Sequence, residues 1–151
     1  MNKFLEEALE EAKKGFKKKE GGPFGAVIVR KGKIIAKAHN KVLKNNDATA
    51  HAEIEAIRQA SKKLKRFDLS DCELYTTCEP CPMCLFAIHW AKIKTVYYGA
   101  ERKDAAKIGF SDKALYDILN GKKSKIKLIK DNSKKCVELM VEFTRLKGKL
   151  Y

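Results

Sequence analysis

Three of the five cysteines in this sequence lie within seven positions, in the segment TTCEPCPMC that ends at Cys84. Cys81 and Cys84 form a C-x-x-C pair. Such a pair can be a redox-active dithiol, half of a four-thiolate structural zinc site, or two ligands of a catalytic metal. A structural zinc closes all four positions with protein ligands, whereas a catalytic zinc usually takes three. The remaining ligands therefore decide what the pair does.

The third ligand is best sought among the histidines, because the sequence has no second C-x-x-C. Of the three histidines (His39, His51 and His89), only His51 has a carboxylate two residues on, at Glu53. H-x-E followed by P-C-x-x-C is the pattern of zinc deaminases, in which His and two Cys hold the metal. We predict a Zn²⁺ site formed by His51, Cys81 and Cys84. A closed zinc site or a thioredoxin-like pair would not require the H-x-E half.

Glu53 is the predicted catalytic residue. Zinc lowers the pKa of a bound water toward about 7, and a nearby carboxylate can then move protons. We expect Glu53 to take a proton and pass it to a ring nitrogen and then to a leaving amino group. Taken alone, Glu53 would be interpreted as a solvated first-turn glutamate beside the helix dipole; beside His51 and the cysteine pair, the catalytic role is favoured. Cys78 is expected to end a strand and to leave the fourth metal position to water.

The apolar spacing and the turn residues predict alternating helices and strands around this site. Helices are expected at 2–19, 50–65, 82–91, 112–120 and 134–146, and strands at 24–29, 34–38, 72–77, 94–99 and 126–129. A hairpin followed by alternating helices and strands implies parallel pairing through helical crossovers. The prediction is an α/β fold, a three-layer α/β/α sandwich on a mixed five-stranded sheet. Residues 1–151 are expected to form a single domain.

Composition narrows the class of protein. The formal net charge is +14, which raises the question of a nucleic-acid partner. Only five of the 33 basic residues are arginines, and the lysines are scattered, so a solvated surface is favoured over a dedicated RNA-binding face. The odd, uneven set of cysteines does not resemble a secreted disulfide framework. With no run of 18 apolar residues, we expect a cytoplasmic protein that does not enter membranes.

Four segments resemble the cytidine deaminase-like superfamily and, within it, the bacterial guanine deaminases. They are GPFGAV from Gly22, NNDATAHAE ending at Glu53, TTCEPCPMC ending at Cys84, and DAAKIGFSD ending at Asp112. The tRNA adenosine deaminases of the same superfamily typically have Val at the positions of Phe24 and Pro82 and a different run before Asp112. The chain departs from the common pattern at Ala48, where Pro is usual, and at Phe86, where a small residue is usual.

The resemblance implies further substrate-binding residues: Asn40, Phe24, Asp112, Trp90 and Tyr151. The Asn40 amide would read a purine edge by donating and accepting, although a turn asparagine is an equal alternative. Phe24 and Trp90 would stack on the base, or else belong to the core. Asp112 would accept a purine N–H or relay a proton, or else cap a helix. Tyr151 would fold over the substrate, or else belong to a disordered end.

The reaction that the resemblance implies is hydrolytic deamination of a nucleobase, with guanine converted to xanthine and ammonia. The alternatives are deamination of the wobble adenosine of a tRNA and deamination of another small base or nucleoside. A metal-dependent RNA-binding domain without turnover is a further alternative, which Glu53 argues against. The superfamily commonly forms dimers, so a homodimer is expected, and the apolar bulk of Phe86 and Trp90 on the Cys-bearing helix is consistent with this.

Overall fold

The computed structural model describes residues 2–131 and 134–150. Four strands form one sheet in the order β2-β1-β3-β4. They are β1 (Gly25–Arg30), β2 (Lys33–His39), β3 (Cys72–Cys78) and β4 (Thr95–Ala100). The central strand β1 is antiparallel to β2 and β3, and β3 is parallel to β4. The sheet is therefore mixed, as the sequence predicts.

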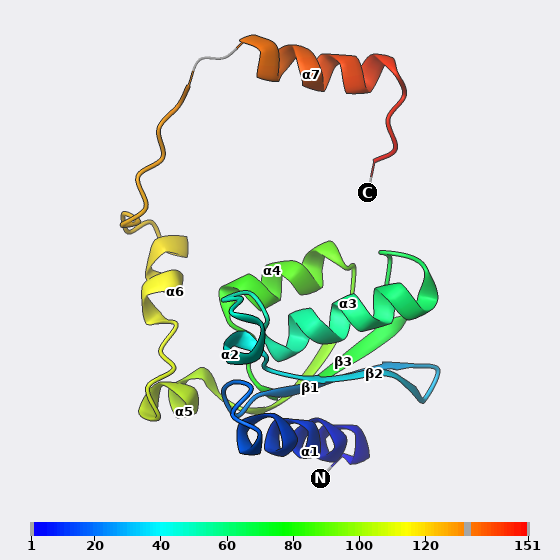
Figure 1. Cartoon of the computed structure of the whole chain (residues 1–151), viewed down its shortest axis with the longest axis vertical. Coiled ribbons are helices and arrows are strands. Elements are labelled where there is room, and N and C mark those ends of the chain that lie inside the picture. The colour runs from blue at the N-terminus through cyan, green and yellow to red at the C-terminus, as the bar shows by residue number, and fades with distance from the viewer. Residues whose placement is uncertain (1, 132–133, 151) are drawn as a thin grey trace.

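Helices cover both faces of this sheet (Figure 1). The first is α1 (Lys3–Lys17), which packs on one face, while α3 (Ala52–Leu64) and α4 (Pro82–Trp90) lie on the other. Shorter helices follow the strands: α2 (Val42–Asn45), α5 (Arg102–Lys107) and α6 (Lys113–Leu119). The last is α7 (Lys134–Arg145). The three-layer α/β/α arrangement predicted from the sequence is confirmed, and α2 and α5 are additional elements.

The core lies on both sides of β1, whose side chains alternate between the faces. Ala26 and Ile28 join the cluster under α3 and α4, whereas Val27 and Val29 pack with α1. Burial on both faces explains why this strand reads as a continuous apolar run rather than as an alternating pattern.

Small residues hold α3 close to the sheet. Ala52, Ala56 and Ala60 are spaced four residues apart and are fully buried on one stripe. The larger Ile57 and Leu64 flank this stripe and are only partly buried. The close packing fixes the N-terminus of α3, and with it His51, against the sheet.

The predicted fifth strand at 126–129 is wrong, and within the described residues the sheet has four strands. Residues 120–131 and 134–150, called here the C-terminal arm, lead away from the body, and α7 lies apart from it (Figure 1). The apolar side chains of 126–129 are exposed, Leu128 by 92%. A strand needs a neighbouring backbone to pair with, and this segment meets none among the described residues, although its composition suits a strand.

None of the described helices combines the length and the apolar character that crossing a membrane requires.

Gly25 is required where α1 crosses the start of β1. A β-carbon at this position would lie 2.0 Å from the carbonyl oxygen of Ala8 and 2.7 Å from the backbone nitrogen of Ala12. We therefore expect Gly25→Ala to push α1 from the sheet and lower the free energy of unfolding by about 1–3 kcal/mol. Urea denaturation measures this.

The matched control is Gly32→Asn in the β1–β2 turn. Gly32 has a φ of +71°, and a β-carbon there would have nothing within 4 Å. Asparagine is among the residues that tolerate this left-handed conformation best, so we expect a loss of about 1 kcal/mol or less and no displacement of α1. Equal stability of Gly25→Ala and the unsubstituted chain would contradict the close-packing argument.

Candidate active site

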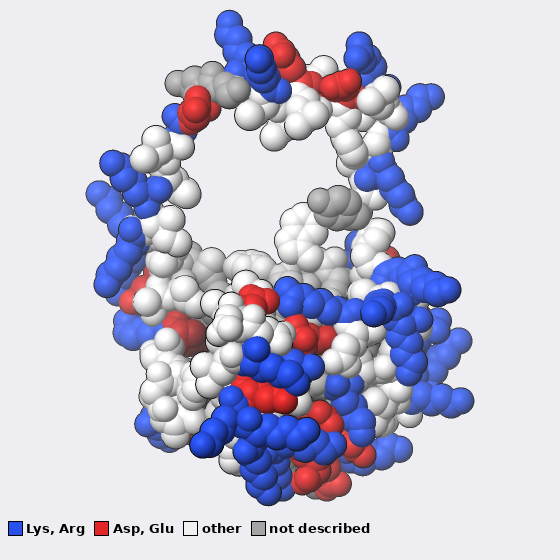
Figure 2. All heavy atoms as spheres, viewed as in Figure 1, with Lys and Arg blue, Asp and Glu red and all other residues white. Residues whose placement is uncertain are grey.

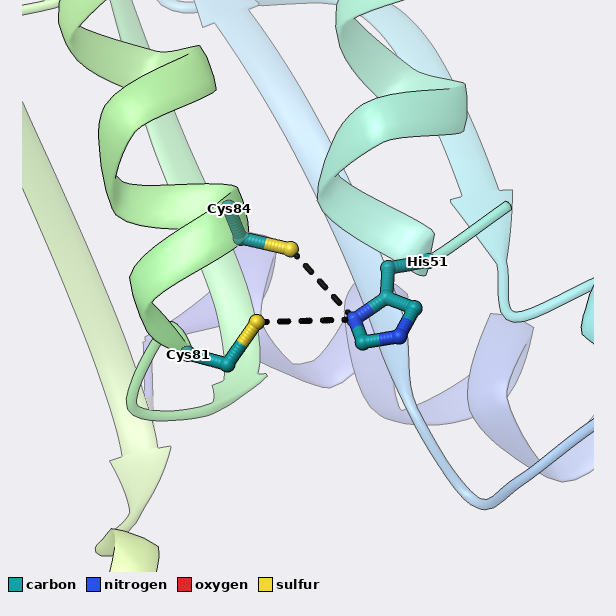
Figure 3. A group of neighbouring side chains, drawn as sticks. All are labelled: His51, Cys81 and Cys84. Atoms are coloured by element: carbon teal, nitrogen blue, oxygen red, sulfur yellow. Dashed lines mark hydrogen bonds between the residues drawn. The ribbon is translucent and has the colours of Figure 1, made fainter. Parts of the chain in front are cut away.

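The predicted metal ligands come from the N-termini of two neighbouring helices. His51 immediately precedes α3, and Cys81 immediately precedes α4, which carries Cys84 in its first turn. Pro82 stands at the first position of α4, where its missing N–H has no intrahelical acceptor to satisfy. Figure 3 shows the three side chains pointing toward one another from these helix ends.

The spacing of the three side chains fits a single zinc ion. Their ligand atoms all lie within 4.8 Å of one another. The Nδ1 atom of His51 is 3.7 Å from the Cys81 sulfur and 3.5 Å from the Cys84 sulfur. Tetrahedral zinc, with bonds of about 2.3 Å to sulfur and about 2.0 Å to nitrogen, separates such a pair by about 3.5 Å. Three ligands leave one position open, as in a catalytic site.

The electrostatics of the two thiols also favour a bound cation. Hydrogen bonding from the Cys84 thiol and from His51 lowers the pKa of Cys81 to about 4. The pKa of Cys84 is raised, because it donates to Cys81 and is buried. The pKa of His51 is raised by its hydrogen bond with Cys81. The site by itself therefore holds only one thiolate comfortably, and a divalent metal would stabilise both.

Glu53 lies beside this cluster, in the first turn of α3 and in the wall of a cavity. Its side chain is buried, with the residue only 6% exposed, and burial is the main cause of its raised pKa. A carboxyl group buried beside a reaction site is suited to taking and returning a proton. Glu53 is not a member of the ligand cluster.

The cavity has a volume of about 470 Å³, within the usual range for small-molecule sites. It brings together six of the nine predicted site residues: Phe24, Asn40, His51, Glu53, Cys81 and Asp112. Cys84 is fully buried directly behind it. Within the described residues, these side chains thus converge only at this cavity, which lies beside the three ligand side chains.

Asn40 has a fixed orientation in this cavity. Its Oδ1 atom accepts hydrogen bonds from the backbone N–H groups of Gly22 (3.4 Å) and Val42 (3.1 Å). The residue is 5% exposed. Because the oxygen is already occupied, the Nδ2 group is the part of the amide left to meet a ligand. The contact of Asn40 with a purine edge stays a prediction, in which the donor Nδ2 is the free part of the amide.

Asp112 also lines the cavity, and it makes no side-chain cap for α6. Both of its carboxylate oxygens instead accept hydrogen bonds from Nε of Arg102, each at 3.1 Å. Phe24 lines the same cavity, and its ring packs at nearly a right angle against the ring of Phe110, with centroids 5.1 Å apart. The helix-capping alternative for Asp112 is therefore not what its side chain does.

Trp90 is not brought to the site. It is the last residue of α4, at the opposite end from the cysteines, and is 67% exposed. It is absent from the cavity lining. The described residues therefore do not bring Trp90 to the cavity, and its stacking on a base stays a prediction. Tyr151 lies outside the described residues.

Cys78 ends β3 and lies outside the ligand cluster, as predicted. Burial raises its pKa to about 11, and its thiol donates to the Glu101 carbonyl at 3.8 Å. It lines the cavity as a neutral thiol.

Sequence reasoning missed Arg102, Glu79, Phe110 and Leu115, all of which line the cavity. Phe110 lies in the DAAKIGFSD segment that carried the resemblance, so a signal for it was present. No pattern in the sequence pointed to Arg102 or Leu115, because an isolated arginine after a strand and a leucine in a short helix are ordinary surface and core residues.

Comparison with known proteins agrees with this geometry. The family described as the cytidine and deoxycytidylate deaminase zinc-binding region matches residues 1–100. The chain belongs to this family. It is therefore a zinc-dependent deaminase, and the His51, Cys81 and Cys84 cluster is its zinc site.

Two kinds of relative share this deaminase fold. The chain is 56% identical to the guanine deaminase of Bacillus subtilis over 113 residues, 75% of this chain and 72% of the relative. The X-ray structure of guanine deaminase from Bacillus subtilis superposes with a TM-score of 0.93 and 43% identity, over 100% of this chain and 99% of the other. The tRNA-specific adenosine deaminase of Aquifex aeolicus is 50% identical over 97 residues, 64% of each chain.

Removing any one of the three ligands should abolish tight zinc binding in this deaminase. Loss of a residue that only supports a ligand typically weakens binding 10–100-fold, so His51→Ala or Cys81→Ser should weaken it by more than about 100-fold. Metal content per chain, measured by elemental analysis after dialysis, tests this. Cys78→Ser is the matched control, since that thiol lies in the same cavity outside the cluster, and it should keep about one zinc per chain. Zinc retained in Cys81→Ser would overturn the ligand assignment.

Proposed function

We propose that the protein converts guanine to xanthine and ammonia by zinc-dependent hydrolysis. The observation that carries the proposal is that one cavity beside the zinc ligands is lined by two polar side chains, Asn40 with its Nδ2 donor left over and the Asp112 carboxylate as an acceptor. The whole-chain similarity to a guanine deaminase supports it.

The polar pair suits the hydrogen-bonding groups of guanine. Guanine offers acceptors at O6 and N7, to which Asn40 Nδ2 can donate, and ring N–H donors, from which the Asp112 carboxylate oxygens can accept. The base edge of adenosine carries a ring acceptor at N1 and no ring N–H. Phe24 offers an aromatic face for the base, and Phe110 supports that ring from its edge.

The zinc ligands and Glu53 have separate roles in the proposed hydrolysis. Zinc, held by His51, Cys81 and Cys84, would activate a water for attack on C2 of the base. Glu53 takes one proton from the attacking water and gives it to N3, so that the C2–O bond forms while the ring stays neutral. It then moves the remaining hydroxyl proton to the amino group, and the C2–N bond breaks to release ammonia. Burial beside the cavity suits Glu53 to both transfers.

The substitution Glu53→Gln tests this role of Glu53. Gln fills the same space but carries no proton to exchange, so we expect zinc content to be unchanged and kcat to fall by at least about 10²-fold. Steady-state ammonia release and metal analysis on the same preparation measure both. The control is Glu55→Gln in the same helix turn, a residue outside the cavity lining and the ligand cluster whose carboxylate pairs with Arg58. Full activity of Glu53→Gln would show that another group moves the proton.

A substrate panel tests the base assignment. Guanine, guanosine, adenine, cytosine and a tRNA with a wobble adenosine are compared by ammonia release, or by inosine formation for the tRNA. We expect guanine to have the highest kcat/KM. Inosine formation in tRNA without turnover of guanine would replace the proposed substrate by wobble adenosine and leave the zinc chemistry intact. On the face drawn in Figure 2, Lys and Arg are spread over the body and arm with Asp and Glu among them, which supports the small base for that face.

We also propose that the chain works as a homodimer in which the C-terminal arm packs on a second copy. The helix α7 is amphipathic, yet its apolar residues are exposed, Met140 by 71%. On the body, Leu85 and Phe86 of α4 are exposed as well. An amphipathic helix of this length is stable in water mainly through packing of its apolar face. The similarity to the Bacillus subtilis structure extends over the arm, which supports an extended arm as its working position.

Light scattering coupled to size exclusion tests the dimer. We expect the full chain to elute as a dimer, and Met140→Asp or Phe86→Asp to shift it toward monomer. Glu138→Gln, on the polar side of α7, is the control and should remain dimeric. A monomeric full chain at micromolar concentration would contradict the proposal.

The two cysteine ligands, Cys81 and Cys84, must be reduced to bind zinc, so we propose that the protein acts in the cytoplasm, where thiols stay reduced. Residues 1–151 are proposed to form one functional domain that exchanges arms with its partner.

A further inference from the structure

Arg102 lies in the cavity wall, although the hydrolysis gives it no role. It opens α5 directly after β4, at the end of the sheet where the metal cluster lies. Its Nε atom is 3.1 Å from each carboxylate oxygen of Asp112. The two side chains are 30% and 18% exposed, so water screens the pair only in part. Within the described residues, no other side chain donates a hydrogen bond to Asp112.

The guanidinium is itself held in place from its other side. Its central carbon lies 3.2 Å from the ring centroid of Tyr116, which is a stacked cation–π contact. The hydroxyl of Tyr116 donates to the carbonyl oxygen of Pro80 at 3.3 Å, immediately before the ligand Cys81. The backbone N–H of Arg102 donates to the Glu79 carboxylate at 3.2 Å. A continuous set of contacts therefore runs from the zinc-binding turn through Tyr116 and Arg102 to Asp112.

We propose that Arg102 is a positioning residue that aims the Asp112 carboxylate at the substrate and so helps select a base with a ring N–H. The inference rests on the proposed function, in which Asp112 contacts the base. Asp112 sits on a short segment between α5 and α6 and caps neither helix with its side chain. Without the guanidinium, its carboxylate could rotate away from the cavity.

The geometry explains why arginine stands at this position. A planar guanidinium can stack on Tyr116 and donate in its own plane to Asp112 at the same time, which a lysine ammonium cannot do. A carboxylate held toward the base accepts from a ring N–H and repels a ring nitrogen lone pair. The pair thus favours guanine over bases whose corresponding edge offers only an acceptor.

Kinetics of Arg102→Met test the role, with Lys103→Met as the matched control. Lys103 is the next basic residue of α5, exposed and paired with Glu101. We expect Arg102→Met to raise KM for guanine by about tenfold or more, because charge-assisted hydrogen bonds typically contribute that much, with kcat and zinc content little changed. Arg102→Lys should restore part of the loss. Lys103→Met should match the unsubstituted chain. An unchanged KM in Arg102→Met would overturn the proposal.

A double-mutant cycle separates positioning through Asp112 from general damage. If Arg102 acts through Asp112, Arg102→Met should have little further effect on KM in an Asp112→Asn background. Equal effects in both backgrounds would refute this coupling. If Asp112→Asn alone leaves KM for guanine unchanged, the proposed substrate contact fails instead, so the two failures are distinguishable. If Arg102→Met folds poorly, Tyr116→Phe replaces it as the test, because it keeps the aromatic ring and loses only the hydrogen bond to Pro80. We expect this variant to raise KM for guanine by a smaller factor. An unchanged KM in Tyr116→Phe would count against the proposal.

Discussion

The whole site depends on two helices, α3 and α4, whose N-termini lie next to each other. His51 precedes α3 and Cys81 precedes α4, and their side chains, with Cys84, surround a space that fits one zinc ion. The helices can approach this closely because α3 lies on the sheet through a stripe of alanines. Two sulfurs in a buried place cannot both be ionised without a nearby cation, so the fold and the metal support each other.

The cavity beside the zinc ligands has two halves, which carry different kinds of residues. The half built by α3, α4 and the end of β3 carries the ligands and Glu53, and it is fixed by the core. The other half comes from the loop before β1, the end of β2 and the segment around α5 and α6, and it carries Phe24, Asn40 and Asp112. In the proposed function, the hydrolytic chemistry and the recognition of one base would thus lie in separate parts of the chain. Changes in the second half can alter the substrate without disturbing the zinc.

The recognition half continues directly into the C-terminal arm. Tyr116 of α6 stacks on Arg102 and contacts Pro80, and the arm begins one turn later. Packing of the arm on a second copy would therefore hold α6, and through it Asp112, in place. In the proposed dimer, assembly and base selection are linked physically, because the same segment serves both. The exposed apolar residues of α7 supply the driving force for the assembly.

The sequence by itself determined the zinc ligands, Glu53 and the α/β/α layers. Ligand chemistry demands particular residue types at particular spacings, and helix and strand periods are local. Only the tertiary structure decided three other features. It left 126–129 unpaired, because strand formation depends on a neighbouring backbone and not on composition. It placed Trp90 away from the cavity, since a helix of nine residues separates its two ends. It brought Arg102 to Asp112 and turned the Asn40 oxygen to the backbone, because hydrogen-bond partners distant in sequence are set by packing.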